Sequence, residues 1–295
     1  TSGDFDGRAD GALAFEAYLR GQQPFRPLIG AAAPSKVLEP NKVVILSTTD
    51  VKGKNGLWLH TPKGGLARRA SFADSIKTQF GQVVVVDGGG FFPEEADSLY
   101  RDKAWFLMDG MVLLGTDAAG LSEKELKYGR GWLLAQLKRS RLPMVCANVW
   151  DKATKKTLVP PYRIVKKGNV SIGIFGLNSD KVDLGPARDS LTIEDPVAAA
   201  KRVVPEMRKQ GATVIVLLSQ LGKVESEDMV TGIDGIDAKM LKGPVGLRRC
   251  AVDEVRNRRH VFLHAVDRLA VALENLVLPG LQLFLEVFEL LLAHV

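Results

Sequence analysis

Residues 83–92 read VVVVDGGGFF, and this run constrains the fold more than any other part of the chain. Four consecutive valines are typical of a short strand that is buried on both faces. Three glycines follow Asp87, and glycine lets the backbone turn sharply and lets another group approach closely. In open α/β sheets, ligand sites collect just beyond the carboxyl ends of the strands. We therefore expect the functional region around residues 87–90.

Strand-like and helix-like segments alternate on both sides of this run, which favours an α/β fold. A hairpin predicted around residues 166–169 indicates a mixed rather than a purely parallel sheet. The predicted strands are 42–47, 83–86, 117–121, 143–147, 162–165, 170–176 and 213–219. The predicted helices are 64–80, 93–114, 123–138 and 196–210.

The composition is that of a soluble globular protein, with 46% hydrophobic and 25% charged residues in a chain of 295. The net charge is +6, but Lys and Arg are scattered without interleaved aromatic residues, so nucleic-acid binding is not expected. Cys146 and Cys250 lie far apart and form no metal-binding or redox motif. The first residues contain no apolar segment typical of a signal peptide.

Changes in composition predict three parts. Residues 1–41 are rich in Gly, Ala and Pro and are expected to form an N-terminal arm, and 42–238 form the main domain. Residues 239–295 form a basic linker followed by an apolar tail, 261–295, which we expect to be helical and broken at Pro279. Acidic residues interrupt the tail, so a membrane span, which needs about 20 mostly uncharged apolar residues, is not expected. The tail is instead a candidate surface for a homo-oligomer or a protein partner, or a segment not native to the fold.

Six short motifs occur in order along the main domain. They are Thr48-Thr49-Asp50-Val51-Lys52-Gly53, Gly64-Gly65-Leu66-Ala67, Gly88-Gly89-Gly90, the segment 122–127 (SEKELK), Cys146-Ala147-Asn148 and Ser219-Gln220-Leu221-Gly222. Together they resemble the N-terminal domain of the 5′-nucleotidase branch of the calcineurin-like metallophosphoesterases. The corresponding family motifs are T-N-D-x-H-G, G-G-L-A, G-G-D, G-N-H-E-F-D, S-A-N and S-H-x-G. The resemblance implies a four-layer α/β/β/α sandwich with mixed sheets, here with a helical C-terminal extension, and the hydrolysis of phosphate esters with two metal ions.

The residues at the matched positions depart from the family's ligand set. By resemblance, Asp50 keeps the first carboxylate, and Gly90 replaces the carboxylate that bridges the two metals. The other replacements are Lys52 for the first histidine, Glu123 for the asparagine ligand, Lys124 for the histidine that protonates the leaving group, Lys127 for the aspartate that orients it, and Gln220 for a histidine ligand. The family's G-G-H-x-H motif has no counterpart after Asp237.

This pattern predicts a metal-free, catalytically inactive 5′-nucleotidase-like protein with a binding or assembly role. We expect Lys52 and Lys124 to replace the metal charges by pairing with Asp50 and Glu123, so that no carboxylate is buried without a partner. By resemblance alone, the protein is expected to be periplasmic or otherwise extracytoplasmic.

Two other functions remain open at this point. One is a phosphoric ester hydrolase with a rearranged site, holding one divalent metal near Asp50 with Glu123 and Gln220. The other is a metal-free phosphate or nucleotide binder that uses Lys52, Lys124 and Arg68. Gly64 and Gly65 precede a predicted helix whose N-terminal N–H groups could hold an anion, although a plain helix start is the favoured interpretation, since double glycine is common in turns. Asp87 and Asn148 have simple structural interpretations, as acceptors or donors toward the backbone.

Overall fold

Apolar residues of Lys42–Thr48 and Val83–Asp87 form β1 and β2 at the centre of the larger sheet. We describe the protein from a computed structural model, in which residues 42–53, 65–95, 98–241 and 248–253 are described. The strand order of this five-stranded sheet is β12-β1-β2-β3-β4. Its other strands are β3 (Ala118–Gly120), β4 (Met144–Val145) and β12 (Arg248–Asp253). β1 to β4 are parallel, and β12 pairs antiparallel with β1.

A second sheet of four strands has the order β11-β10-β8-β7. Its strands are β7 (Tyr162–Lys167), β8 (Val170–Asn178), β10 (Val214–Gln220) and β11 (Ala238–Leu241). β7 and β8 form the predicted antiparallel hairpin, whereas β10 is parallel to both of its neighbours, so the sheet is mixed as expected. A small antiparallel sheet contains β5 (Val149–Asp151), β6 (Lys156–Thr157) and β9 (Leu191–Ile193).

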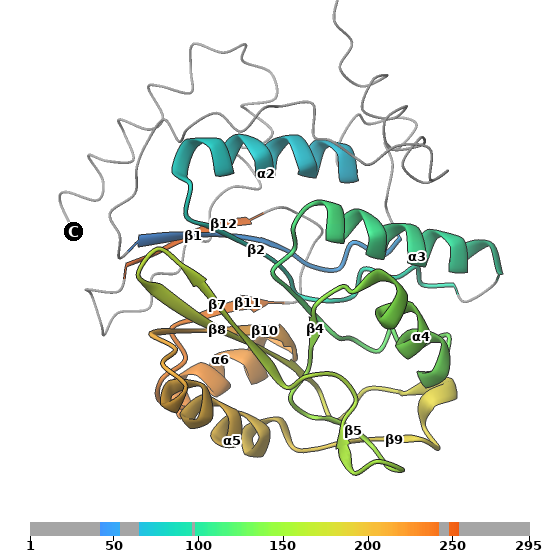
Figure 1. The fold of residues 1–295 in the computed structure, drawn as a ribbon. Coiled ribbons are helices and arrows are strands. Elements are labelled where there is room, and N and C mark those ends of the chain that lie inside the picture. Colours follow the sequence, from blue (N-terminus) through green and yellow to red (C-terminus); the bar gives the residue numbers. More distant parts are fainter. Residues whose placement is uncertain (1–41, 54–64, 96–97, 242–247, 254–295) are drawn as a thin grey trace, which may run out of the picture. The chain divides into compact units, whose positions relative to one another are not determined.

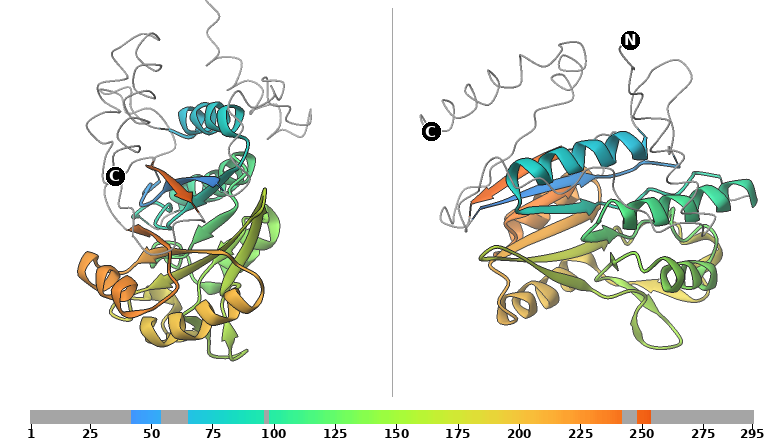
Figure 2. Two further views of the ribbon diagram at one scale, coloured as in Figure 1. Left: turned by 90° about the vertical axis from the view of Figure 1, so that its left-hand side faces the viewer. Right: turned by 45° about the horizontal axis from the view of Figure 1, so that its top comes forward.

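Helices cover the outer faces of the two larger sheets (Figures 1 and 2). The helices are α2 (Leu66–Phe80), α3 (Ser98–Leu113), α4 (Arg130–Ser140), α5 (Pro196–Lys209) and α6 (Lys223–Gly232), with a 3-10 turn η1 at Gly185–Ala187. α5 begins at an N-cap, Asp195, whose side chain accepts a hydrogen bond from the backbone N–H of Ala198. A proline at the first helical position completes this start signal.

The four layers follow from the period of two along the buried strands. In β1, Val43 and Ile45 point into an apolar cluster shared with the second sheet, while Val44 and Leu46 pack against α2. β2 divides its valines in the same way between the two clusters. A third cluster joins the second sheet to α5, with residues of α6 included. The described domain is therefore the expected α/β/β/α sandwich.

Two element boundaries differ from the sequence prediction. The helix predicted for 123–138 begins only at Arg130, because residues 123–129 form turns with N–H to C=O bonds three residues apart. These turns place the side chain of Glu125 in the protein interior. A regular helix that began at residue 123 would not have to bury this side chain. The helix predicted for 93–114 begins at Ser98.

The predicted basic linker contains two strands. β11 and β12 lie within residues 239–295 apart from Ala238, and they extend the second and the first sheet, respectively. A strand with one polar face alternates apolar and polar residues, but β11 and β12 have only four and six residues, so the pattern was hidden in a basic segment. The arm 1–41 and the tail 261–295 lie outside the described residues, and their predicted roles stay predictions. Within the described residues, we find no helix long and apolar enough to cross a membrane.

Candidate functional site

The carboxyl ends of β1, β2, β3 and β10 converge, as expected for the ends of parallel strands. The loop after β1 is tied to the glycine run after β2, since the N–H of Asp50 donates to the carbonyl of Gly89 at 2.9 Å. From the second sheet, the amide Nε2 of Gln220 donates to the carbonyl of Gly88 at 2.8 Å. The loop after β3 contributes Glu123 and Lys124. The structure thus brings together residues from four separate motifs.

Lys124 is the central charge of this site. Its Nζ lies 3.4 Å from Oδ1 of Asp50 and 3.5 Å from Oε1 of Glu123. The side chains of Lys124 and Asp50 are only 9% and 3% exposed. Burial alone would lower the pKa of Lys124, but attraction to Glu123 and Asp50 outweighs it and raises the pKa above its ordinary value. The side chain is therefore an ammonium ion held by two carboxylates from different loops.

Gly90 leaves no room for a side chain. Its φ of 73° lies in the left-handed region that favours glycine. A Cβ built on this backbone would lie 2.6 Å from Oδ1 of Asp50, much closer than atoms of this kind approach. The backbone at the position of the family's bridging carboxylate is packed directly against the one remaining carboxylate of the set.

Glu125 is a site residue that the sequence analysis missed. Its carboxylate is fully buried and accepts hydrogen bonds from the backbone N–H groups of Gly90, Phe92 and Ser122 and from the Ser122 hydroxyl, at 2.7–3.1 Å. Burial raises its pKa, and these hydrogen bonds oppose that effect. Glu125 fastens the loop after β3 to the glycine run. The signal was available, since Glu125 is the one residue of SEKELK that matches G-N-H-E-F-D.

Lys52 does not join this cluster, so the expectation that it pairs with Asp50 or Glu123 is wrong. Its Nζ lies 3.0 Å from Oε1 of Glu94, and both side chains are substantially exposed. A hydrogen bond from Lys52, together with its charge, lowers the pKa of Glu94. The backbone of Lys52 is left-handed, with a φ of 51°. Its side chain pairs with Glu94 and not with Asp50. Lys127 also reaches Glu94, donating to its backbone carbonyl.

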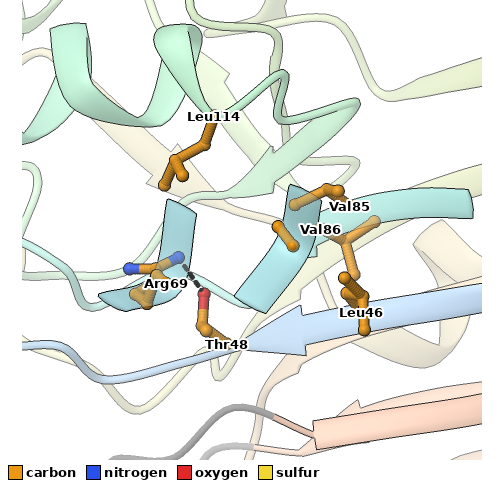
Figure 3. Close-up of a pocket in the computed structure, with 7 residues that line it drawn as sticks. Leu46, Thr48, Arg69, Val85, Val86 and Leu114 are labelled. Atoms are coloured by element: carbon orange, nitrogen blue, oxygen red, sulfur yellow. Dashed lines mark hydrogen bonds between the residues drawn. The ribbon is translucent and has the colours of Figure 1, made fainter. Parts of the chain in front are cut away.

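Asp87 lies under α2, and both oxygens of its carboxylate interact with neighbouring groups of the protein. Its Oδ1 accepts from the N–H of Gly89 at 2.9 Å, which confirms the predicted backbone role. Its Oδ2 accepts from the Thr48 hydroxyl and lies 3.4 Å from Nη2 of Arg69 on α2. Burial raises the pKa of Asp87, opposed by Arg69. Figure 3 shows the bond between Arg69 and Thr48 beside a small apolar cavity, whose volume of about 10 Å³ is room for a single water.

The remaining predicted residues have different outcomes. Asn148 is fully buried and donates to the carbonyls of Asn178 and Glu194 at 2.7 and 3.1 Å, so its predicted backbone-bonding role is confirmed. The anion-site candidates stay predictions: Gly65 precedes the first residue of α2, while Gly64 and the side chain of Arg68 lie outside what the structure describes. Within the described part of the chain, no group of three or more His, Cys, Asp or Glu residues is arranged to hold a metal ion.

The chain resembles known nucleotidases in both sequence and structure. It is 31% identical over 208 residues to a 2′,3′-cyclic-nucleotide 2′-phosphodiesterase/3′-nucleotidase of Yersinia enterocolitica, a match covering 61% of this chain and 32% of the relative. It is 28% identical over 229 residues to a 5′-nucleotidase of Vibrio cholerae, covering 74% and 40%. The calcineurin-like phosphoesterase YfkN of Bacillus subtilis has a similar structure, with a TM-score of 0.59 and 25% identity over 67% of this chain and 70% of that one.

In sequence and in fold, the chain is similar to the 5′-nucleotidase-like branch of the calcineurin-like metallophosphoesterases. No family model matches it. It spans 32% and 40% of the length of the two curated relatives named above, so it corresponds to a part of each. This similarity agrees with the observed four-layer fold and with the order of the motifs along the chain.

Proposed function

We propose that this chain is a non-catalytic metallophosphoesterase-fold protein with a binding or assembly role. The observation that carries the proposal is the contact of Gly90 with Asp50, where a Cβ would lie 2.6 Å from Oδ1. A carboxylate that bridges two metals needs a side chain at this position and open space in front of it. Gly90 has neither.

The donor set does not fit two divalent ions. Two-metal hydrolysis places the ions about 3.5–4 Å apart and needs carboxylate and imidazole ligands for both of them. Here the cluster has the carboxylates of Asp50 and Glu123, and the ammonium of Lys124 already lies between them. A second cation at this place would be repelled by that ammonium. No hydrolytic step can be derived from these residues.

The other two functions inferred from the sequence have weaker support. A phosphate or nucleotide binder would need cationic side chains directed at the ligand, yet Lys52 pairs with Glu94 and Lys124 with Asp50. A single-metal hydrolase would need Lys124 to leave Asp50 and Glu123. By analogy with its relatives, we also propose an extracytoplasmic location, and we keep the tail 261–295 as the proposed partner surface.

The test combines metal analysis with an assay. The purified protein is incubated with Mn²⁺ and Zn²⁺, desalted, and its metal content is measured; hydrolysis of 5′-AMP, 2′,3′-cyclic AMP and a chromogenic phosphate ester is then followed. We expect less than about one tenth of a metal ion per chain, and a background rate identical to that of Asp50→Asn. Stoichiometric metal, together with a rate that Asp50→Asn abolishes, would overturn the proposal and support the hydrolase.

A further inference from the structure

We propose that the outer edge of β7 is a docking site for an extended segment of a partner protein. The segment carries the pattern acidic, apolar, apolar, acidic, and it adds to the second sheet as one more strand. The inference rests on the proposed binding role. It deepens that role by naming the surface and the chemical class of the partner.

The first support is the open edge itself. β7 is the last strand of the second sheet, and among the described strands it pairs with β8 alone, as the outer half of a hairpin (Figure 1). No backbone hydrogen bond joins another described segment to its outer side. Alternate residues of such a strand direct their N–H and C=O groups outward, so the edge is a template for pairing. Its six residues extend about 20 Å, which is a full-length strand.

The second support is the apolar pair in the middle of β7. Ile164 packs against the cluster between the second sheet and α5, and Val165 packs against the cluster between the two sheets. Both side chains are only partly buried, and no described strand lies beyond them. Successive residues of a strand point to opposite faces, so two consecutive apolar residues on an added strand would extend both clusters.

The third support is the pair of cations that flanks these residues. Arg163 and Lys166 are exposed, and neither forms an ion pair within the described part of the chain. Lys167 differs, since its Nζ already lies 3.2 Å from Oδ1 of Asp117. Residues directly opposite each other on paired strands share a face, so a carboxylate opposite each unpaired cation would lie within reach of it. The cations are three positions apart, and the complementary segment therefore reads acidic, apolar, apolar, acidic in either strand direction.

The same charges exclude a second copy of β7. The strand contains three basic residues and no acidic residue, so two copies would place like charges along a shared edge. Charged residues on edge strands commonly prevent such pairing. An acidic segment converts this repulsion into attraction, and specific interfaces often use one set of charges to accept one partner and reject another. Charge complementarity therefore selects an acidic partner over a copy of this chain.

The experiment titrates the full chain into a fluorescent peptide of sequence TTEVVETT and follows the anisotropy of the peptide. The peptide TTKVVKTT tests the charge requirement. Two further acidic peptides, N-methylated on the odd or on the even positions, test backbone pairing, because methylation removes N–H donors from one edge of the peptide. Hydrogen exchange measured by mass spectrometry then shows whether the amides of β7 are protected by the acidic peptide.

We expect Arg163→Gln/Lys166→Gln to bind the acidic peptide about fivefold more weakly than the wild type, because two cross-strand charge pairs are lost. Lys138→Gln/Lys201→Gln is the matched control: it removes two exposed cations from α4 and α5 that have no ion pair in the described part of the chain. This control should bind like the wild type. Arg163→Glu/Lys166→Glu should prefer the lysine peptide, and one of the two methylated peptides should lose binding.

Several results would overturn the docking edge: no binding at millimolar peptide, protection outside β7, binding that neither methylated peptide loses, or equal weakening in both glutamine variants. A wild type that dimerises, with β7 amides more protected at higher protein concentration, would also overturn it, because the occupant would then be a second copy. The metal analysis and hydrolysis assay test the proposed function separately. An active hydrolase that binds the acidic peptide at β7 would retain the docking edge and lose the non-catalytic assignment. A metal-free, inactive protein without peptide binding would lose only the docking edge.

Discussion

A Cβ on Gly90 would lie 2.6 Å from Oδ1 of Asp50, so a side chain at residue 90 would force the Asp50 carboxylate to move. The absence of a side chain at residue 90 therefore matches the way in which the backbone is arranged around it. Restoring an aspartate there is therefore not a simple reversal. Together with the ammonium of Lys124, the contact gives the cluster a structure that does not depend on a metal.

Gly90→Asp should destabilise the protein without creating a metal site. A non-glycine residue at a φ of 73° costs about 1–3 kcal/mol, and the overlap with Asp50 adds to this. Gly211→Asp is the matched control, because its φ is 89° and a Cβ there meets nothing within 4 Å. Urea unfolding should show the larger loss for Gly90→Asp. Equal losses would mean that the contact with Asp50 has no energetic weight.

Glu125→Gln should lower the free energy of unfolding by about 1–3 kcal/mol. The glutamine oxygen can take over one set of hydrogen bonds, but its NH₂ group would then face either the N–H of Phe92 or the donors of Gly90 and Ser122. Glu225→Gln serves as a control for the same chemical change at the surface, where Lys181 is the partner. Chemical denaturation measures both. A Glu125→Gln protein as stable as Glu225→Gln would refute the fastening role.

The pH dependence of Glu125 has a definite sign. Burial raises its pKa in the folded state above the ordinary value of 4.5, so the folded state holds the proton more tightly than the unfolded state. The contribution of Glu125 to stability is then full below pH 4.5 and declines as pH rises through the folded pKa. The difference in free energy of unfolding between wild type and Glu125→Gln should shrink across that interval. Urea titrations at several pH values test this, and a difference that grows with pH would contradict it.

Arg69→Met should destabilise the protein by about 3 kcal/mol, because Asp87 would remain fully buried without its cationic partner. Adding Asp87→Asn should recover part of the loss, since the uncompensated charge is then gone. Arg188→Met is the control: it removes an ion pair with Asp183 in which both side chains are 71% exposed, and no measurable change is expected. Thermal and urea unfolding of the four proteins would show this pattern, and an absent recovery would indicate that packing of Arg69 matters more than its charge.

Local patterns in the sequence were sufficient for most of the framework. The runs of β1, β2 and β10 are so apolar that burial on both faces is the one arrangement that keeps them from water, and the strands lie where they were predicted. The resemblance of the motifs to the family's site implied the convergence of Asp50, Gly90, Lys124 and Gln220. For the residues that follow β1, β2 and β3 there is also a physical reason, because the carboxyl ends of parallel strands in one sheet meet at the same edge, whereas Gln220 comes from the second sheet.

Only the tertiary structure decided which charges pair. Lys52 and Lys124 look equivalent as replacements for histidines, yet one pairs at the surface with Glu94 and the other inside with Asp50. The choice depends on backbone angles and on distances between residues far apart in the chain, which local spacing does not encode. The same reason applies to β12, whose basic sequence pairs with β1 across some 200 residues of chain. Sequence determined what each segment could become, and packing determined its neighbours.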